Sequence, residues 1–215
     1  MDFFRQMDIV KGEALEVSIT IIGCGGIGSF VTLALAKMGC REITVYDHDT
    51  VEEHNIPNQL YRLEDIGRSK VEALAGIVKA YTGFSLGVRP ERFDGQKPQG
   101  MVISAVDSMQ ARRQIWERSV RYRAGVPLYV DARMGAEVAR IYTIQPSDPD
   151  DVRFYEATLH GDEEAFRLPC TARAIIYTGF SIAGLIANQV KKFAMREALK
   201  REIIFDHKTL TLVTS

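Results

Sequence analysis

The chain has 215 residues, of which 46% are hydrophobic and 26% charged, and its net charge is −1. This length suits one sizeable α/β domain, and the near-neutral charge argues against nucleic acid as a partner. The three cysteines (Cys24, Cys40 and Cys170) lack a C-x-x-C spacing, which disfavours a disulfide scaffold and a structural zinc and favours the cytoplasm. The most apolar window, residues 174–187, is too short to cross a bilayer, so we expect a soluble protein without membrane contact.

The first part of the chain alternates between apolar runs and helical periodicity, the pattern of β-α-β units. Ser108 stands at the start of a charged amphipathic segment, where its hydroxyl can cap the helix. The predicted strands are 17–22, 42–46, 84–88 and 101–106, and the predicted helices are 27–38, 67–81 and 108–124.

The pattern changes after residue 127. Residues 128–131 and 137–144 are predicted strands with no helix between them, and 202–205 with 209–213 form a predicted hairpin. We therefore expect a single α/β domain over residues 1–215, with helices on both faces of a Rossmann-like mixed sheet. The sheet should be parallel in the N-terminal half, with antiparallel strands added in the C-terminal half.

An acidic stretch separates the two groups of predicted strands. Residues 146–168 carry many more aspartates and glutamates than arginines, and a connection of this length is unusual unless it is functional or disordered. We expect an acidic crossover loop or lid here, with a plain solvated loop as the equal alternative.

A glycine-rich turn joins the first predicted strand to the first predicted helix. Glycines in such a turn let the backbone approach a phosphate, and the following helix start offers free N–H groups. By itself the turn predicts only a nucleotide, and Asp47 at the end of the next strand would suit a dinucleotide ribose. The glycines of the turn are Gly23, Gly25, Gly26 and Gly28.

Two further residues favour a nucleoside triphosphate over a dinucleotide. Lys70 stands at a predicted helix start, where its charge opposes the helix dipole unless an anion is bound there. Asp107 ends an apolar strand, and an acid beside phosphates is favourable when a divalent cation lies between them. Together with the glycine turn, they predict a site for ATP and Mg²⁺.

Several motifs together resemble the ThiF/MoeB/HesA family of adenylating enzymes, relatives of the ubiquitin-activating enzymes. The resemblance covers nearly the whole chain, roughly residues 4–193. The motifs are Gly-Cys-Gly-Gly-Ile-Gly at 23–28, Tyr-Asp-His-Asp-Thr-Val-Glu-Glu-His-Asn at 46–55 with Gln59, Gly-x-x-Lys at 67–70, Asp-Ser-x-x-Ala-Arg at 107–112, and, more weakly, Cys-Thr-Ala-Arg-Ala at 170–174.

The resemblance implies ATP-dependent adenylation of the C-terminal glycine carboxylate of a small ubiquitin-like sulfur carrier or modifier with a Gly-Gly tail, with release of pyrophosphate. It also implies a homodimer. By the same resemblance, the four glycines would form the nucleotide loop, Asp47 would hold the ribose, and Asp107 would hold Mg²⁺. Phosphate contacts would come from Asn55, Gln59 and Lys70.

The sequence departs from the family at one phosphate contact. The family has arginine where this chain has Asn58, and an amide cannot neutralise phosphate charge. We expect Arg62 to substitute; the alternative is a non-catalytic subunit. Cys170 falls where relatives often keep an acyl- or sulfur-accepting cysteine, but no base partner is visible in the sequence, which favours the alternative of a residue packed at the start of the last helix. A third reading, an NAD(P)-binding Rossmann oxidoreductase, leaves Lys70 and Asp107 without a role.

Overall fold

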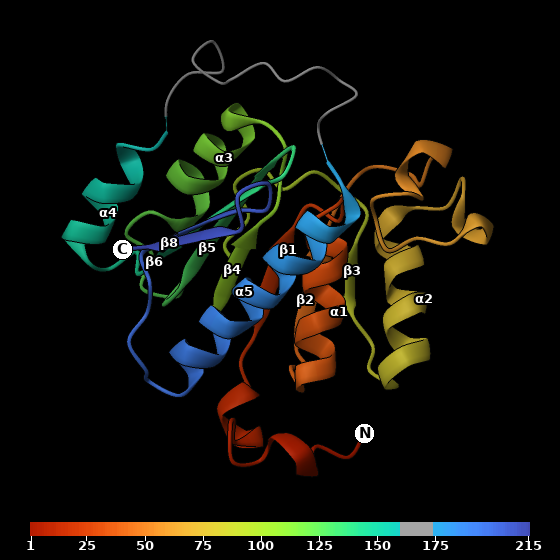
Figure 1. The fold of residues 1–215 in the computed structure, drawn as a ribbon, viewed down its shortest axis with the longest axis horizontal. Coiled ribbons are helices and arrows are strands. Elements are labelled where there is room, and N and C mark those ends of the chain that lie inside the picture. The colour runs from red at the N-terminus through yellow and green to blue at the C-terminus, as the bar shows by residue number, and fades with distance from the viewer. Residues whose placement is uncertain (160–173) are drawn as a thin grey trace.

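A mixed eight-stranded sheet forms the centre of the computed structural model, which describes residues 1–159 and 174–215 (Figure 1). Its strand order is β3-β2-β1-β4-β5-β6-β7-β8. The five strands β3, β2, β1, β4 and β5 pair in parallel. Strands β6, β7 and β8 continue the sheet beyond β5 with antiparallel pairing. The bounds are β1 Ile19–Ile22, β2 Ile43–Tyr46, β3 Gly87–Arg89, β4 Met101–Ser104, β5 Tyr129–Gly135, β6 Val138–Ile144, β7 Glu202–Asp206 and β8 Thr211–Thr214.

Helices cover both faces of the sheet, as the sequence predicts. On one face, α1 (Gly28–Met38) packs between α2 (Lys70–Thr82) and α5 (Ile176–Ala194). On the other face lie α3 (Met109–Ile115) and α4 (Pro149–Glu156). Each face has its own apolar core, one around α1, α2 and α5 and one beneath α3 and α4 that includes Trp116, Tyr129, Tyr142 and Tyr155.

The central parallel strands β1 and β4 are mostly apolar, as expected for strands that are covered on both faces. All residues of β1 and β4 are buried. The carboxyl ends of these strands meet at one edge of the sheet, drawn uppermost in Figure 1, while the N-terminal 3-10 turns lie at the opposite edge. Any ligand of the glycine turn therefore binds at the upper edge.

Two predicted segments differ from the structure. The single helix expected over 108–124 is α3 followed by a π-helical stretch, Trp116–Val120, although Ser108 caps α3 as predicted. The expected acidic loop contains the helix α4, which begins because Asp148 accepts a hydrogen bond from the Asp150 amide and Pro149 takes the first helical position. The remainder of that acidic stretch, from residue 160 on, lies outside the described residues.

None of the helices in the described ranges combines the length and apolarity that a bilayer crossing requires. Helix α5 has buried residues along its length and carries Lys191 and Lys192 in its last turn. It packs against α1 and the sheet.

Candidate nucleotide-binding site

The glycine turn between β1 and α1 is held tightly against the end of β4. Gly23 has a φ of +91°, and a Cβ placed on it would lie 2.7 Å from the Ala105 carbonyl oxygen. A Cβ on Gly28 would lie 1.8 Å from the Gly23 carbonyl oxygen. Both positions therefore require glycine for steric reasons, and the turn has one defined shape.

The two inner glycines differ, because a Cβ on Gly26 would lie 3.2 Å from the Asn58 carbonyl oxygen, whereas Gly25 is open. A Cβ on Gly25 would meet nothing closer than Gln59 Nε2, at 4.0 Å. The other end of that amide, Gln59 Oε1, is buried and has no hydrogen-bond partner within the described parts of the chain. The open backbone at Gly25 leaves room for a ligand, and the unsatisfied Oε1 calls for a hydrogen-bond donor such as a hydroxyl. Only the Nε2 end of this amide can donate to a phosphate.

Asp47 connects the turn to the end of β2. Its carboxylate is buried and accepts hydrogen bonds from the amides of Cys24, at 2.7 Å, and Asp49, at 2.9 Å. Each carboxylate oxygen can accept more than one hydrogen bond, so Asp47 can fix the turn and still receive a ribose hydroxyl.

Lys70, the first residue of α2, is brought to the same edge. Its side chain is largely buried, and Nζ donates to Asp49 Oδ2 at 2.9 Å. Partial burial favours a higher pKa for Asp49, but the hydrogen bond and charge of Lys70, with His48 and Arg92, outweigh it and lower that pKa. Lys70, Asp49, Asp47 and Cys24 thus form one hydrogen-bonded chain ending in the glycine turn.

Asn55 and Tyr61 hold the segment that follows β2. Asn55 is buried, and its Oδ1 accepts from the Glu52 amide at 2.9 Å, so its side chain here caps a 3-10 turn. The Tyr61 hydroxyl donates to the Cys24 carbonyl at 2.7 Å, and burial raises the Tyr61 pKa. Sequence reasoning missed Tyr61, because a lone tyrosine carries no pattern that marks it as a support of the turn.

Arg62 is engaged with acids. Its guanidinium makes two hydrogen bonds to Asp65, at 2.9 and 3.0 Å, and an ion pair with Glu64. Asp65 is fully buried and also pairs with Arg68. The structure therefore gives Arg62 a place in an ion-pair cluster, and does not bring its guanidinium to the glycine turn.

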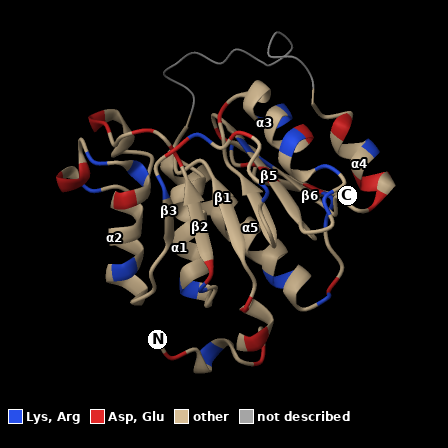
Figure 2. Ribbon diagram, turned by 180° about the vertical axis from the view of Figure 1, so that it is seen from behind, with Lys and Arg blue, Asp and Glu red and all other residues tan. Residues whose placement is uncertain are grey.

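Asp107 lies exposed just after β4, whose continuation at Ala105 touches the glycine turn. Figure 2 shows acidic and basic residues interspersed along this edge of the sheet. A second group of possible metal ligands (Asp47, His48 and Asp49) has ligand atoms within 4.8 Å of one another. The donors are carboxylate-rich, which fits Mg²⁺ in chemistry.

Two residues singled out in the sequence have different outcomes. Cys170 lies outside the described residues. Arg112, which could have been a solvated helix residue, is buried and contacts Asp131 and the Ala132 carbonyl. Nothing in the sequence pattern marked Asp131 as the partner of Arg112.

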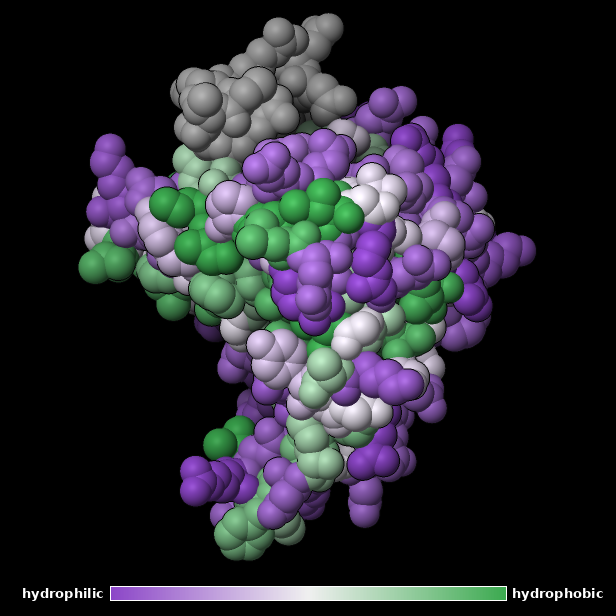
Figure 3. Space-filling model, turned by 90° about the vertical axis from the view of Figure 1, so that its right-hand side faces the viewer, coloured by the Kyte–Doolittle hydropathy of each residue, from purple (hydrophilic) through white to green (hydrophobic). Residues whose placement is uncertain are grey.

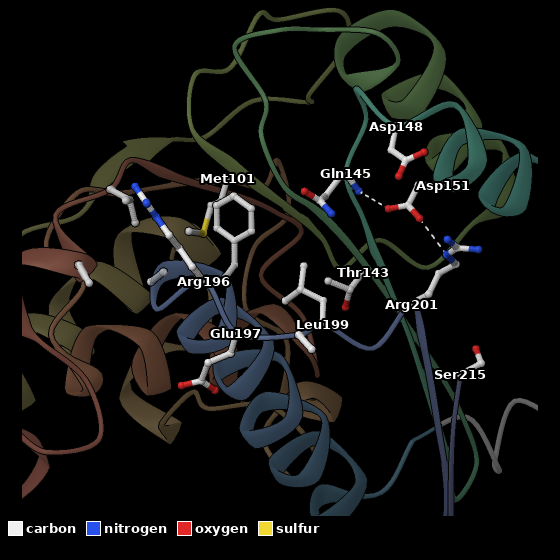
Figure 4. Close-up of a pocket in the computed structure, with 15 residues that line it drawn as sticks. Met101, Thr143, Gln145, Asp148, Asp151, Arg196, Glu197, Leu199, Arg201 and Ser215 are labelled. Atoms are coloured by element: carbon white, nitrogen blue, oxygen red, sulfur yellow. Dashed lines mark hydrogen bonds and ion pairs between the residues drawn. The ribbon is translucent and has the colours of Figure 1, made fainter.

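A separate hollow of about 770 Å³ lies near the start of β4 and the end of α5 (Figure 4). Its wall includes Met101, the first residue of β4, and an ion pair of 2.8 Å between Asp151 and Arg201. Because the glycine turn lies at the carboxyl ends of the parallel strands, this hollow is not part of the nucleotide site.

A parallel sheet with a glycine turn, an acid after the next strand and a helix-start lysine at its carboxyl edge defines a Rossmann-like nucleotide-binding domain. The ThiF family model matches residues 10–212, so the chain belongs to the ThiF family. It is 31% identical over 115 residues to the NEDD8-activating enzyme E1 catalytic subunit of Dictyostelium discoideum, covering 50% of this chain and 26% of that protein.

Solved structures share the fold. Escherichia coli MccB, solved with ATP, superposes with a TM-score of 0.72 at 18% identity, over 95% of this chain and 65% of MccB. PaaA superposes with a TM-score of 0.75 at 20% identity, over 100% of this chain and 68% of PaaA. At these identities the likeness establishes the fold alone, and the chain spans about a quarter of the Dictyostelium relative.

Proposed function

We propose that this protein uses ATP and Mg²⁺ to adenylate the C-terminal carboxylate of a small protein or peptide. The observation that carries the proposal is the hydrogen-bonded chain from Lys70 through Asp49 and Asp47 to the glycine turn. Membership of the ThiF family and the similarity to an enzyme named for activating NEDD8 support it. The same arrangement fits a phosphate chain laid along the turn, with a ribose at Asp47.

In the proposed reaction, a carboxylate oxygen attacks the α-phosphorus of ATP. The bond from that phosphorus to the bridging oxygen breaks, and pyrophosphate leaves. The amides of the glycine turn and Lys70 bind and orient the phosphates, and Gln59 Nε2 donates to them. Asp107 would hold Mg²⁺. Bound Mg²⁺ would neutralise phosphate charge. Positioning and charge neutralisation of this kind account for most of the catalysis in such transfers.

The proposed substrate is a ubiquitin-like sulfur carrier or modifier ending in Gly-Gly, and the proposed assembly is a homodimer in the cytoplasm. Free buried thiols at Cys24 and Cys40 suit a reducing compartment. Apolar surface, interleaved with polar atoms, gathers on the side that carries α2 and the segment before it (Figure 3). Leu63 is 72% and Ile66 43% exposed in that segment, which is compatible with a subunit contact.

The ion pairs of Arg62 favour a second candidate function, that of a nucleotide-binding subunit without catalytic activity. Asn58 stands where the family has arginine, and Arg62 pairs with Asp65 and Glu64. If those ion pairs persist when ATP binds, no arginine from this segment reaches the phosphates. ATP would then be bound but not used.

The test is ATP–pyrophosphate exchange measured with and without small proteins that end in Gly-Gly, obtained by capture on the immobilised protein. Exchange should depend on the added protein and should collapse in Lys70→Ala and Asp107→Ala. Lys79→Ala, an exposed lysine on the same helix, is the control. Exchange at the normal rate in both site variants would refute the assignment, and ATP binding without exchange would select the second candidate.

A further inference from the structure

A fully buried carboxylate, Asp131, lies in β5 beside the end of β4. Its oxygens receive Arg112 Nη1 at 3.3 Å, Arg133 Nε at 2.8 Å and the Tyr155 hydroxyl at 3.1 Å. One acid thus joins groups from β5, α3 and α4. Because a buried charge without partners is costly, these contacts constrain one another's positions.

The first of these contacts leads to the proposed metal ligand. Arg112 lies one turn into α3, and its amide bonds to the Ser108 carbonyl at 3.2 Å. The Ser108 hydroxyl in turn caps α3 by accepting from the Ala111 amide. Since Asp107 directly precedes Ser108, anchoring the Arg112 side chain to Asp131 and the Ala132 carbonyl fixes the backbone that carries Asp107.

The second contact leads to the end of α4. Arg133 donates to the Thr158 carbonyl at 3.1 Å and to the Thr158 hydroxyl at 3.0 Å, and its guanidinium lies 4.5 Å from the Tyr142 ring centroid. Arg113, the neighbour of Arg112, donates to the Leu159 carbonyl at 2.6 Å. The start of α3 and the residues after α4 are therefore held by the same group of side chains.

We propose that Asp131 is a positioning residue of the nucleotide site, which sets the place of Asp107 through Arg112 and ties it to the end of α4 through Arg133. This inference rests on the proposed function, because it assumes that Asp107 holds Mg²⁺. Asp131 itself touches neither the nucleotide nor the metal. Its role is to keep the first turn of α3 in one position on β5.

The experiment measures the dissociation constant of ATP by calorimetry, once with Mg²⁺ and once with EDTA. The dissociation constant in EDTA divided by the constant with Mg²⁺ gives the enhancement of binding by Mg²⁺, and this quotient is the ratio compared among the variants. Asp131→Asn should lower this ratio roughly tenfold, the lower end of the effect of outer-shell changes at metal sites, and should leave binding in EDTA unchanged. Asp107→Ala should remove the Mg²⁺ enhancement altogether.

A purely structural role would change the melting temperature and not the ratio. Because Asp131→Asn can fail to fold, Arg112→Lys is the second variant, which keeps the charge but loses the two-donor contact. The control is Arg118→Gln. Arg118 lies just after α3 and forms a half-exposed ion pair with Asp94, and its replacement should leave the ratio unchanged.

An unchanged ratio in folded Arg112→Lys and Asp131→Asn overturns the positioning role while leaving the proposed function intact. Absence of ATP binding by the unmodified protein overturns the proposed function, and the positioning role with it. A lowered ratio in either variant, with binding in EDTA preserved, supports the positioning role.

Discussion

Lys70 Nζ lies 2.9 Å from Asp49 Oδ2, so the cation expected to bind phosphate is paired with an acid. The Lys70 side chain is 9% exposed and that of Asp49 52% exposed. An incoming phosphate must therefore compete with a partner that can turn toward solvent. The pair keeps the buried ammonium neutralised when no anion is bound.

Asp49→Asn should accordingly tighten ATP binding in EDTA. The change removes a negative charge beside the phosphates and frees Lys70. Partly exposed ion pairs contribute about 0.2–1 kcal/mol, so the gain should not exceed about fivefold. Calorimetry at low and high salt tests this, because the gain should shrink as salt screens the charges. Weaker binding by Asp49→Asn would show instead that Asp49 itself contacts the ligand.

The same pair predicts a pH dependence of stability. Lys70 lowers the pKa of Asp49 in the folded protein, so the contribution is present above the unfolded pKa and is lost as pH falls through the lowered folded pKa. The melting temperature of the unmodified protein should exceed that of Asp49→Asn at pH 6, and the difference should shrink below about pH 4. A difference that persists at pH 2.5 would contradict this origin.

Gly25 and Gly28 should respond differently to alanine. Gly28→Ala places a methyl group 1.8 Å from a backbone oxygen, so we expect destabilisation of at least about 1–3 kcal/mol. Gly25→Ala would touch only the Gln59 side chain, at an unstrained 4.0 Å, and should keep its melting temperature. It should nevertheless weaken ATP binding about tenfold by filling the phosphate approach. Normal ATP binding by Gly25→Ala would show that the nucleotide does not bind against the glycine turn.

Arg62→Ala distinguishes the two candidate functions. If Arg62 stays with Asp65 and Glu64, its removal should lower the melting temperature, because Asp65 is fully buried and loses two hydrogen bonds. MgATP affinity should then remain within about twofold. Arg68→Ala, which removes another partner of Asp65, is the matched control. A selective loss of ATP affinity in Arg62→Ala would mean that the arginine leaves the cluster when nucleotide binds.

The sequence predicts the sheet well because its parallel strands are buried on both faces. β-Branched runs such as Ile19–Ile22 leave little ambiguity, and the absence of a helix between the later strands correctly indicates antiparallel pairing. Helix α4 was missed because its helical signal is a cap and a first-turn proline within an acidic stretch, and both are also turn signals. The π-helical continuation of α3 depends on tertiary contacts, such as Trp116 Nε1 to Glu156 at 3.1 Å.

The sequence predicts a site residue well when its type is unusual at that position unless it binds a ligand, as for an acid at a strand end or a lysine at a helix start. Asp47 and Lys70 meet that condition, and the structure brings both to the glycine turn. Side-chain partners far apart in sequence were not predictable. The hydrogen bonds of Tyr61 to the Cys24 carbonyl and of Arg112 to Asp131 depend on how the elements pack. The periodicity of a sequence does not tell which residues from distant segments will meet.

The cysteines allow a final prediction about reactivity. Cys24 and Cys40 are fully buried; burial raises the pKa of Cys40 to about 12, and burial followed by the charge of Asp47 raises that of Cys24. Thiols with a raised pKa are largely protonated at pH 8, and the thiolate is the reacting species. In Cys170→Ser, iodoacetamide should therefore label the native protein very slowly and the urea-unfolded protein readily. Rapid labelling of native Cys170→Ser, located by mass spectrometry, would show that the glycine turn or the end of α1 opens to solvent. If the unmodified protein labels quickly at Cys170 alone, that thiol is accessible to a reagent, as the acceptor role that the family resemblance implies requires.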